Sequence, residues 1–208
     1  MKKIVCYFIL LASTFLIMAC KPTSEAASKP TEEAATKTTG EFFGTDISAA
    51  SFANTLNLTD HTGKARTLAD FKDKVIVLFF GYTHCPDVCP TTMSDLKNVM
   101  KLLGEQSDQV QVLFVTVDPE RDTQEILAQF VPSFDKRFIG LRGDEAQTKE
   151  TLKNFKIFYS KVEGEKQGDY TIDHSAGMYV FDKAGKIRIY MGYGQKIPEM
   201  VSDIKKLL

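Results

Sequence analysis

Runs of apolar residues along the chain predict alternating strands and helices. Residues 75–82, VIVLFFGY, form a continuous β-branched and aromatic run, which is typical of a strand buried on both faces, and residues 110–118, VQVLFVTVD, form a second. Between them, residues 90–104, PTTMSDLKNVMKLLG, carry apolar side chains at helical spacing and end in glycine, which predicts a helix. This order of strand, helix and strand predicts an α/β domain with a central sheet.

Weaker patterns extend the order of elements toward both ends of the domain. Alternating apolar positions around a His-Thr-Gly turn predict an N-terminal β-hairpin over residues 54–68. After the second core strand we expect a DPERD turn, a helix, a short strand, a helix, a strand, a closing hairpin and a final helix. These elements span residues 118–122, 123–131, 137–141, 145–155, 157–163, 176–192 and 197–208. The whole order is thioredoxin-like, with a central sheet flanked by helices.

The beginning of the chain has the pattern of a secretion signal. Two lysines precede an apolar stretch that closes on Ala19, just before Cys20. A membrane span would need roughly 20 apolar residues with suitable flanks, whereas polar sequence follows Cys20 at once. Residues 17–20, Ile-Met-Ala-Cys, resemble a bacterial lipobox, whose cysteine is acylated after cleavage. We therefore expect a lipoprotein signal peptide over residues 1–19 and a lipid on Cys20.

The predicted lipid places the protein at the cell envelope, anchored to a membrane and facing the periplasm or the outer surface. The alternative is a soluble periplasmic protein that is cut near Ala19. Residues 21–40 contain no aromatic residue and no Leu, Ile or Val, so they cannot bury enough apolar surface to offset their ordering entropy. We expect residues 20–40 to be a disordered tether that carries one domain over residues 41–208.

Charge and cysteine content narrow the function. The chain has 26 basic and 27 acidic residues and no basic stripe, so it lacks the electrostatic pattern of a nucleic-acid-binding protein. Of its four cysteines, Cys6 leaves with the signal and Cys20 is acylated, which leaves Cys85 and Cys89 in the mature protein. In an oxidising compartment, two cysteines in one short motif indicate a functional site or a small bridge and not a disulfide scaffold.

The two cysteines fall where the first core strand is followed by a helix. The carboxyl ends of sheet strands are the usual ligand site of open α/β sheets. At a helix N-terminus the backbone N–H groups favour thiolate over thiol, and thiolate is the form that attacks disulfides and binds metals. Pro86 and Pro90 stiffen the loop and the helix entry. This pattern is compatible with a disulfide, a redox pair or a metal site, although a redox dithiol usually has the closer Cys-x-x-Cys spacing.

A histidine in the last third of the chain adds a third candidate residue. His174 precedes the closing hairpin, in the loop that lies beside the cysteine turn in thioredoxin-like folds. Thiol oxidoreductases usually have a cis-proline in that loop, where this chain has Ser175 and Ala176. A histidine replaces proline poorly in substrate docking but is a good metal ligand. The histidine therefore favours the metal site.

Four segments together are similar to one known family. They are FFGYTHCPDVCPTTM at 79–93, VTVDPERDT at 115–123, FIGLRGD at 138–144 and DHSAGMYVFD at 173–182. They resemble the Sco/SenC family of copper metallochaperones over essentially the whole domain. The resemblance implies a thioredoxin fold that binds Cu(I) or Cu(II) through the thiolates of Cys85 and Cys89 and the imidazole of His174. It also implies a partner, the copper-binding subunit of cytochrome c oxidase or another copper client, whose copper centre receives copper or whose cysteines are kept reduced. Soft thiolates select Cu(I), and an added imidazole allows Cu(II) as well.

Other functions of the same residues are weighed against this one. The main alternative is a thiol-disulfide oxidoreductase that acts on client disulfides through Cys85 and Cys89. A peroxidase should show a Pro-x-x-x-Thr-x-x-Cys pattern, which is missing around these thiols, and zinc would need a fourth ligand or an open catalytic position. We expect His84 to point away from the cysteines, and Asp87 and Asp118 to be outside the ligand set, where they could still tune the thiolates.

Overall fold

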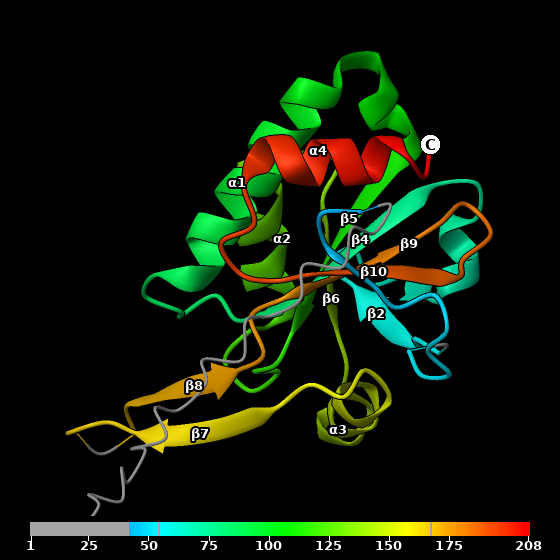
Figure 1. Cartoon of the computed structure of the whole chain (residues 1–208). Helices are drawn as coiled ribbons and strands as arrows, with labels where there is room; N and C mark the ends of the chain where they lie inside the picture. The colour runs from blue at the N-terminus through cyan, green and yellow to red at the C-terminus, as the bar shows by residue number, and fades with distance from the viewer. Residues whose placement is uncertain (1–41, 54, 167) are drawn as a thin grey trace, which may run out of the picture. The chain divides into compact units, whose positions relative to one another are not determined.

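A mixed β-sheet forms the centre of the domain (Figure 1). The computed structural model describes residues 42–53, 55–166 and 168–208, so the predicted signal peptide and tether lie outside the described residues. In the described part of the chain, eight strands form this sheet in the order β1-β10-β9-β4-β5-β6-β2-β3, and β7 and β8 form a separate two-stranded sheet. The strands are β1 (Thr45–Asp46), β2 (Leu58–Asp60), β3 (Ala65–Arg66), β4 (Val75–Gly81), β5 (Val110–Thr116), β6 (Ile139–Arg142), β7 (Tyr159–Glu163), β8 (Tyr170–His174), β9 (Met178–Phe181) and β10 (Ile187–Met191).

Helices cover the sheet, and their apolar faces are set by the sequence pattern. They are η1 (Leu68–Phe71), α1 (Val88–Leu103), η2 (Gly104–Gln109), α2 (Gln124–Phe134), α3 (Glu145–Asn154) and α4 (Ile197–Lys205). In α1 the buried side chains recur every three or four residues, and Gly104 ends the helix with a positive φ of 58°. An Asp144 capping box with Gln147 begins α3. Helices α1 and α4 pack on each other (Figure 1).

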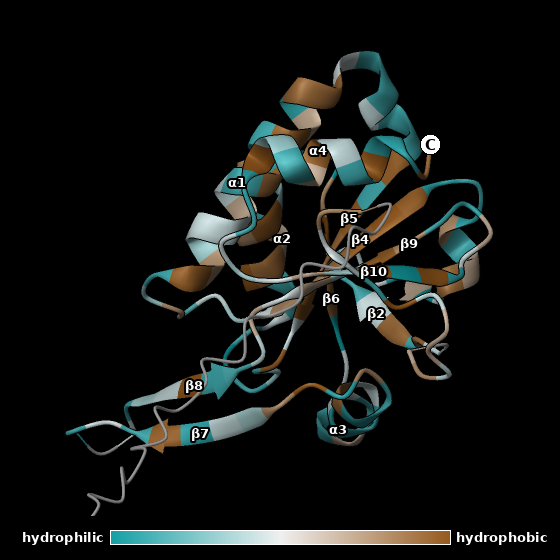
Figure 2. Cartoon of the chain, viewed as in Figure 1, coloured by the Kyte–Doolittle hydropathy of each residue, from teal (hydrophilic) through white to brown (hydrophobic). Residues whose placement is uncertain are grey.

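Neighbouring residues of β4 show that both faces of the sheet are covered. Phe79 contacts Phe114, which in turn contacts Phe130 of α2. Phe80 points to the other face and packs on Phe155, at the end of α3. All seven residues of β4 and of β5 are buried, and the two strands pair in parallel. The apolar strands stand out in Figure 2, whereas the helices show both apolar and polar residues. This is the structure expected for continuous apolar runs.

The structure confirms the α/β, thioredoxin-like arrangement, including the N-terminal hairpin, which is β2 and β3. Three details differ from the prediction. Helix α2 continues past Pro132 to Phe134, so this proline lies inside the helix, where it cannot donate a hydrogen bond to the carbonyl of Ala128. The short edge strand β1 was not expected. Strand β8 was also missed, so His174 ends a strand instead of lying in a loop.

The β7–β8 hairpin projects away from the main sheet (Figure 1). Its strands pair from Tyr159 with His174 to Glu163 with Tyr170. Most of its side chains are exposed or half-buried, and Ile172 is the buried one. The hairpin therefore carries His174 back toward the core of the domain, where the cysteines lie.

Of the helices within the described ranges, none has the length and apolarity to cross a bilayer.

Candidate metal centre

The two cysteines lie between β4 and α1, as the sequence predicts. Cys85 is in the connecting loop and is partly exposed, whereas Cys89 is the second residue of α1 and is fully buried. Both carry free thiols. The backbone N–H of Cys89 donates a hydrogen bond to Cys85 Sγ at 3.4 Å. The Cys85 sulfur is therefore held over the first turn of α1, where helix N–H groups have no partner within the helix.

Gly81, the last residue of β4, leaves room for the Cys89 sulfur. A Cβ atom on Gly81 would lie 3.1 Å from Cys89 Sγ and 2.8 Å from the Phe114 ring. Both distances are shorter than ordinary van der Waals contacts, and neither neighbour is at the surface. A side chain here would overpack the core directly beneath the site.

His174 approaches the cysteines from the end of β8. Its Nδ1 is 2.9 Å from the Ser175 carbonyl oxygen, and its Nε2 is 3.6 Å from Cys89 Sγ. A carbonyl can only accept, so Nδ1 carries the proton and Nε2 presents its lone pair to the Cys89 thiol. The rings of Phe79 and Tyr82 hold the imidazole edge-on. A metal-ligating histidine is commonly oriented in this way, with one nitrogen bound to a carbonyl and the other free to coordinate.

Burial decides the protonation of these groups. Burial raises the pKa of the Cys89 thiol far above its ordinary range, and it lowers the pKa of His174. The expectation that the helix N-terminus favours a thiolate is therefore wrong for Cys89, because desolvation of the charged sulfur outweighs the helix dipole. Both groups are neutral as they stand. The imidazole is ready to coordinate, and a cation that binds Cys89 must displace its proton.

Cys85 and His174 line one open pocket of about 410 Å³. The remaining lining residues come from the cysteine loop, the β7–β8 hairpin and the segment after it: Tyr82, Pro86, Asp87, Val88, Phe158, Thr171, Ile172, Asp173 and Ala176. Phe158 is 63% exposed at this pocket. Cys89 lies in the core behind the pocket wall, in contact with His174. The pocket thus gives access from solvent to the two residues nearest the buried thiol.

The donor atoms of Cys85, Cys89 and His174 are of the types that bind copper, although the three side chains are not grouped closely enough to form one ligand set. Among the residues that the structure describes, no three His, Cys, Asp or Glu side chains are grouped closely enough to hold a metal ion. The structure brings Cys89 and His174 into contact and places Cys85 beside Cys89 through its backbone N–H. Two sulfurs and one imidazole are donors that suit copper in both common oxidation states. The residues present therefore fit copper in type and neighbourhood.

A buried carboxylate that was not predicted from the sequence, Asp122, lies beneath the cysteine loop. Asp122 accepts hydrogen bonds from Thr83 Oγ1 and Thr116 Oγ1, each at 2.6 Å, and from the Thr83 backbone N–H. These three residues are called the Asp122 network below. Asp122 ends the DPERD turn, which follows β5, and Thr83 follows β4. Asp122 could have been considered because β4 and β5 were both recognised as core strands, and the carboxyl ends of parallel strands meet at one edge of the sheet.

Three residues near the motif, which were expected to lie outside the ligand set, have partners of their own. Asp118 is buried and accepts from Tyr170 Oη at 2.8 Å and from Arg121 Nε at 2.5 Å. The Nδ1 of His84 lies 3.1 Å from Thr83 Oγ1, and half of its side chain is exposed. Asp87 precedes α1 and is exposed at the wall of the pocket. Asp118 therefore binds the β8 strand, and of these three residues Asp87 is the one that borders the pocket that Cys85 and His174 share.

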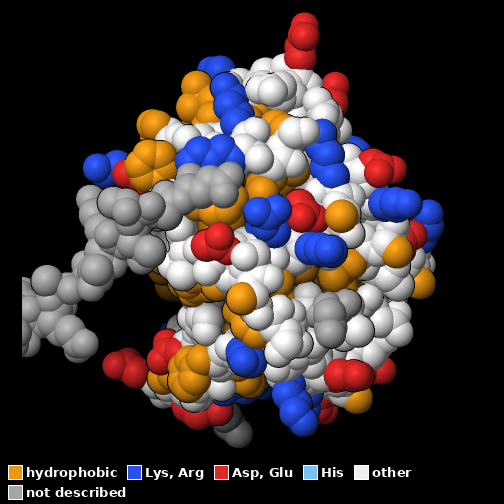
Figure 3. Space-filling model, turned by 45° about the vertical axis from the view of Figure 1, so that its right-hand side comes forward, with side chains coloured by type: hydrophobic (Ala, Val, Ile, Leu, Met, Phe, Trp, Pro, Cys, Tyr) orange, Lys and Arg blue, Asp and Glu red, His pale blue; other side chains and the backbone are white. Residues whose placement is uncertain are grey.

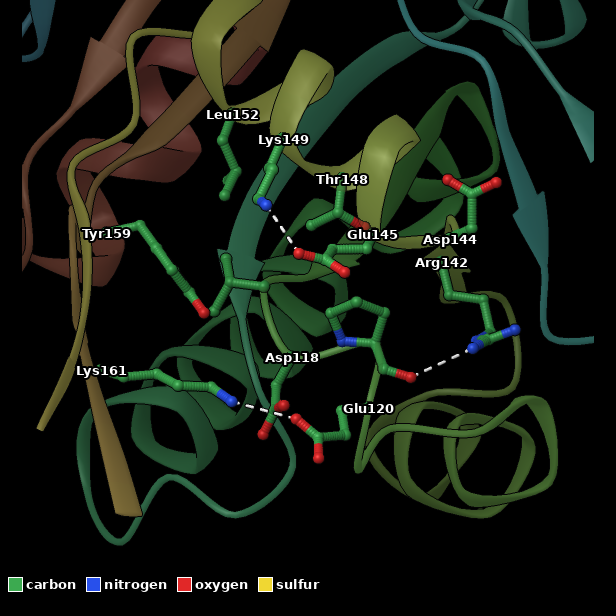
Figure 4. Close-up of a pocket in the computed structure, with 12 residues that line it drawn as sticks. Asp118, Glu120, Arg142, Asp144, Glu145, Thr148, Lys149, Leu152, Tyr159 and Lys161 are labelled. Atoms are coloured by element: carbon green, nitrogen blue, oxygen red, sulfur yellow. Dashed lines mark hydrogen bonds and ion pairs between the residues drawn. The ribbon is translucent and has the colours of Figure 1, made fainter. Parts of the chain in front are cut away.

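A second pocket, of about 370 Å³, lies between the loop after β5, helix α3 and strand β7 (Figure 4). Its charged side chains are paired: Lys149 binds Glu145 at 2.6 Å and Lys161 binds Glu120 at 3.0 Å. Arg142 donates to the Pro119 carbonyl. On the face shown in Figure 3, Lys and Arg side chains are likewise interspersed with Asp and Glu. Neither the pocket in Figure 4 nor the face in Figure 3 concentrates charge of one sign.

Comparisons with known proteins agree with the fold. The sequence model of the SCO1/SenC family matches residues 44–208. The mouse protein SCO2 homolog, mitochondrial, is 34% identical over 160 residues, which cover 76% of this chain and 63% of that protein. The chain thus matches less than two thirds of this relative's length. Bradyrhizobium japonicum ScoI, solved with copper bound, has a TM-score of 0.69 and 38% identity over 74% of this chain and 98% of its own. A SCO1/SenC family lipoprotein from Bacillus anthracis has a TM-score of 0.63 and 27% identity over 76% of this chain and 97% of its own.

Proposed function

Because the chain belongs to the SCO1/SenC family, we propose that it is a copper-binding metallochaperone of the cell envelope. Its cargo is Cu(I) or Cu(II), and its client is the copper-binding subunit of cytochrome c oxidase or another copper protein. The similarity to Bradyrhizobium japonicum ScoI, which was solved with copper bound, supports the cargo. The observation that carries the proposal is the contact between Cys89 Sγ and the free Nε2 of His174, at 3.6 Å.

The proposed ligands are Cys85, Cys89 and His174. Cys89 and His174 already touch, and the Ser175 carbonyl holds the imidazole in the tautomer that coordination needs. Cys85 shares the pocket with His174 and can reach the ion from the solvent side. Two thiolates suit Cu(I), and the imidazole completes a set that also suits Cu(II). Because two thiolates neutralise Cu(II), the charge cost of a partly buried ion is small.

A second candidate function is thiol-disulfide exchange with a client. The observation that favours it is the unequal exposure of the two thiols, since Cys85 is open to the pocket and Cys89 is buried. An accessible thiol that attacks and a buried thiol that resolves would serve a reductase. In this function the protein keeps the cysteines of the client's copper centre reduced, and His174 has no required part.

We further propose that the protein is anchored to a membrane through a lipid on Cys20. The lipobox-like residues 17–20 support this, and the Bacillus anthracis structural neighbour is described as a lipoprotein. The signal peptide over residues 1–19 is removed, and residues 20–40 tether the domain of residues 41–208 to the lipid. Such a tether would let the copper pocket reach a client in the same membrane.

Copper transfer tests the proposed function and separates it from the alternative. Full-length protein is purified in detergent from copper-supplied cells, its copper content is measured, and it is mixed with a copper-free client domain. We expect about one copper per chain and its appearance on the client. A protein that binds no copper under these conditions, yet reduces a disulfide on the client, would replace the metallochaperone by the reductase.

A further inference from the structure

Asp122 is a fully buried carboxylate that has no lysine or arginine partner among the described residues. Among the residues with described positions, no lysine or arginine nitrogen lies within the 4 Å ion-pair distance of its oxygens. The nearest basic group is the half-exposed ring of His84, with Nδ1 at 3.8 Å from Oδ1. Burying a carboxylate without a counter-charge is costly. A charge retained in such a place needs either strong donors or a cation that binds next to it.

The two neighbouring arginines do not supply that charge. Arg142 Nε donates to the backbone carbonyl of Asp122 at 3.2 Å, and not to its carboxylate. Arg121 pairs with Asp118 and donates to the Tyr170 carbonyl. The donors around Asp122 are instead neutral hydroxyls and an amide from the Asp122 network.

The hydrogen bonds around Asp122 suit an ionised carboxylate. Both hydroxyl contacts are 2.6 Å, within the range of about 2.5–2.7 Å for an O–H donor to a charged oxygen. Burial raises the pKa of Asp122, and the hydrogen bonds from Thr116 and Thr83 oppose that effect. The Thr83 backbone N–H can only donate, and the Thr116 hydroxyl, which accepts from the Asp118 N–H, has its hydrogen left for Asp122.

The carboxylate is positioned to influence the proposed copper site. Thr83 is two residues before Cys85, and its backbone N–H and hydroxyl both bind Asp122. The Asp122 network therefore fixes the loop that presents Cys85. The carboxylate thus lies against the same loop that presents the Cys85 sulfur.

The charge has opposite consequences for the two oxidation states. Two thiolates with Cu(II) are neutral overall, whereas two thiolates with Cu(I) carry one negative charge. A nearby carboxylate repels the second state more strongly, and this repulsion is poorly screened inside the protein. The carboxylate therefore shifts the equilibrium toward Cu(II).

We infer that Asp122 is a positioning residue of the copper site, which holds the Cys85 loop through Thr83 and lowers the Cu(II)/Cu(I) midpoint potential with its charge. This inference rests on the proposed function, because it requires copper at the two cysteines. Through this charge, the Asp122 network favours one oxidation state of the copper cargo, Cu(II).

The test compares two aspartates that are equally buried. Asp122→Asn removes the charge and keeps the size of the side chain. Asp203→Asn makes the same change on α4, where the carboxylate accepts from the backbone N–H groups of Phe43 and Gly44. The midpoint potential of each copper-loaded, full-length protein is measured by redox titration of the thiolate-to-Cu(II) absorption. Unfolding is followed separately by circular dichroism.

We expect Asp122→Asn to bind copper with a Cu(II)/Cu(I) affinity ratio about tenfold lower, which raises the one-electron potential by ~59 mV. Asp203→Asn should lose stability and keep the potential of the parent protein. An unchanged potential in Asp122→Asn would overturn the inference while the proposed function stands. Absence of copper from the parent protein would overturn both. If Asp122→Asn does not fold, Asp122→Ser is measured instead, and failure of both to fold would assign Asp122 to folding alone.

Discussion

Replacing His174 with alanine should separate a copper site from a bare redox pair. The substitution removes the imidazole that contacts Cys89 Sγ at 3.6 Å and leaves both thiols in place. Cu(I) tolerates two sulfur ligands, whereas Cu(II) needs the additional nitrogen. The variant should therefore lose Cu(II) and its thiolate charge-transfer colour and keep part of its Cu(I). Disulfide reduction, which needs only the thiols, should be largely unchanged.

The size of the effect follows from the place of His174. Loss of a residue that only supports a ligand costs about 10–100-fold in metal affinity, so loss of a ligand should cost Cu(II) at least ~100-fold, or ~2.8 kcal/mol. Stability should change less. The buried Cys89 thiol loses His174 Nε2 as its hydrogen-bond acceptor. Water from the adjacent pocket can take the place of this acceptor, so the loss of unfolding free energy is only ~1 kcal/mol. Such a loss lowers Tm by ~2–4 °C.

Competition with oxidation-state-selective chelators measures the two affinities separately. His61→Ala is the matched control, since His61 lies in the β2–β3 turn and its Nδ1 accepts from the Gly140 N–H, outside the copper pocket. The control should keep both affinities. If His174→Ala kept its Cu(II) affinity within tenfold of the parent protein's, the assignment of His174 as a copper ligand would be wrong.

Three further outcomes are expected. Cys89→Ser should lose both Cu(I) and Cu(II) in equilibrium dialysis, because a hydroxyl is a hard, neutral donor; retention of either ion would count against Cys89 as a ligand. Gly81→Ala should lose ~1–3 kcal/mol of unfolding free energy in urea titrations, because its Cβ would crowd Phe114 and Cys89, and a loss below ~0.5 kcal/mol would show that the core adjusts. Cys20→Ala should move the protein from the detergent phase to the aqueous phase, and parent protein in the aqueous phase would refute the lipid anchor.

Continuous apolar runs made the core of the fold predictable. Strands β4 and β5 are buried on both faces, so their sequences contain little besides apolar residues and no alternation is needed to recognise them. Helix α1 was recognisable from its spacing and its terminal Gly104. Strand β8 was missed because its hairpin lies outside the main sheet, and its residues alternate around a single buried side chain, Ile172.

The proximity of the proposed ligands was predictable from the sequence, whereas their electrostatics was not. Cys85, Cys89 and His174 could be chosen because the motif and the order of elements bring them to one end of the sheet. The protonation of Cys89 could not, since it depends on how much of the surrounding core excludes water. The contact of Asp122 with Thr83 was not predicted either, because the parallel pairing of β4 and β5 brings their following loops together without saying which side chains bind each other.

X-ray absorption at the copper edge tests the central claim most directly. Full-length protein loaded with Cu(II) should show two sulfur neighbours and at least one imidazole nitrogen, and His174→Ala loaded with Cu(I) should keep the sulfurs and lose the imidazole. Copper surrounded only by nitrogen and oxygen, or an imidazole signal that persists in His174→Ala, would contradict coordination by Cys85, Cys89 and His174.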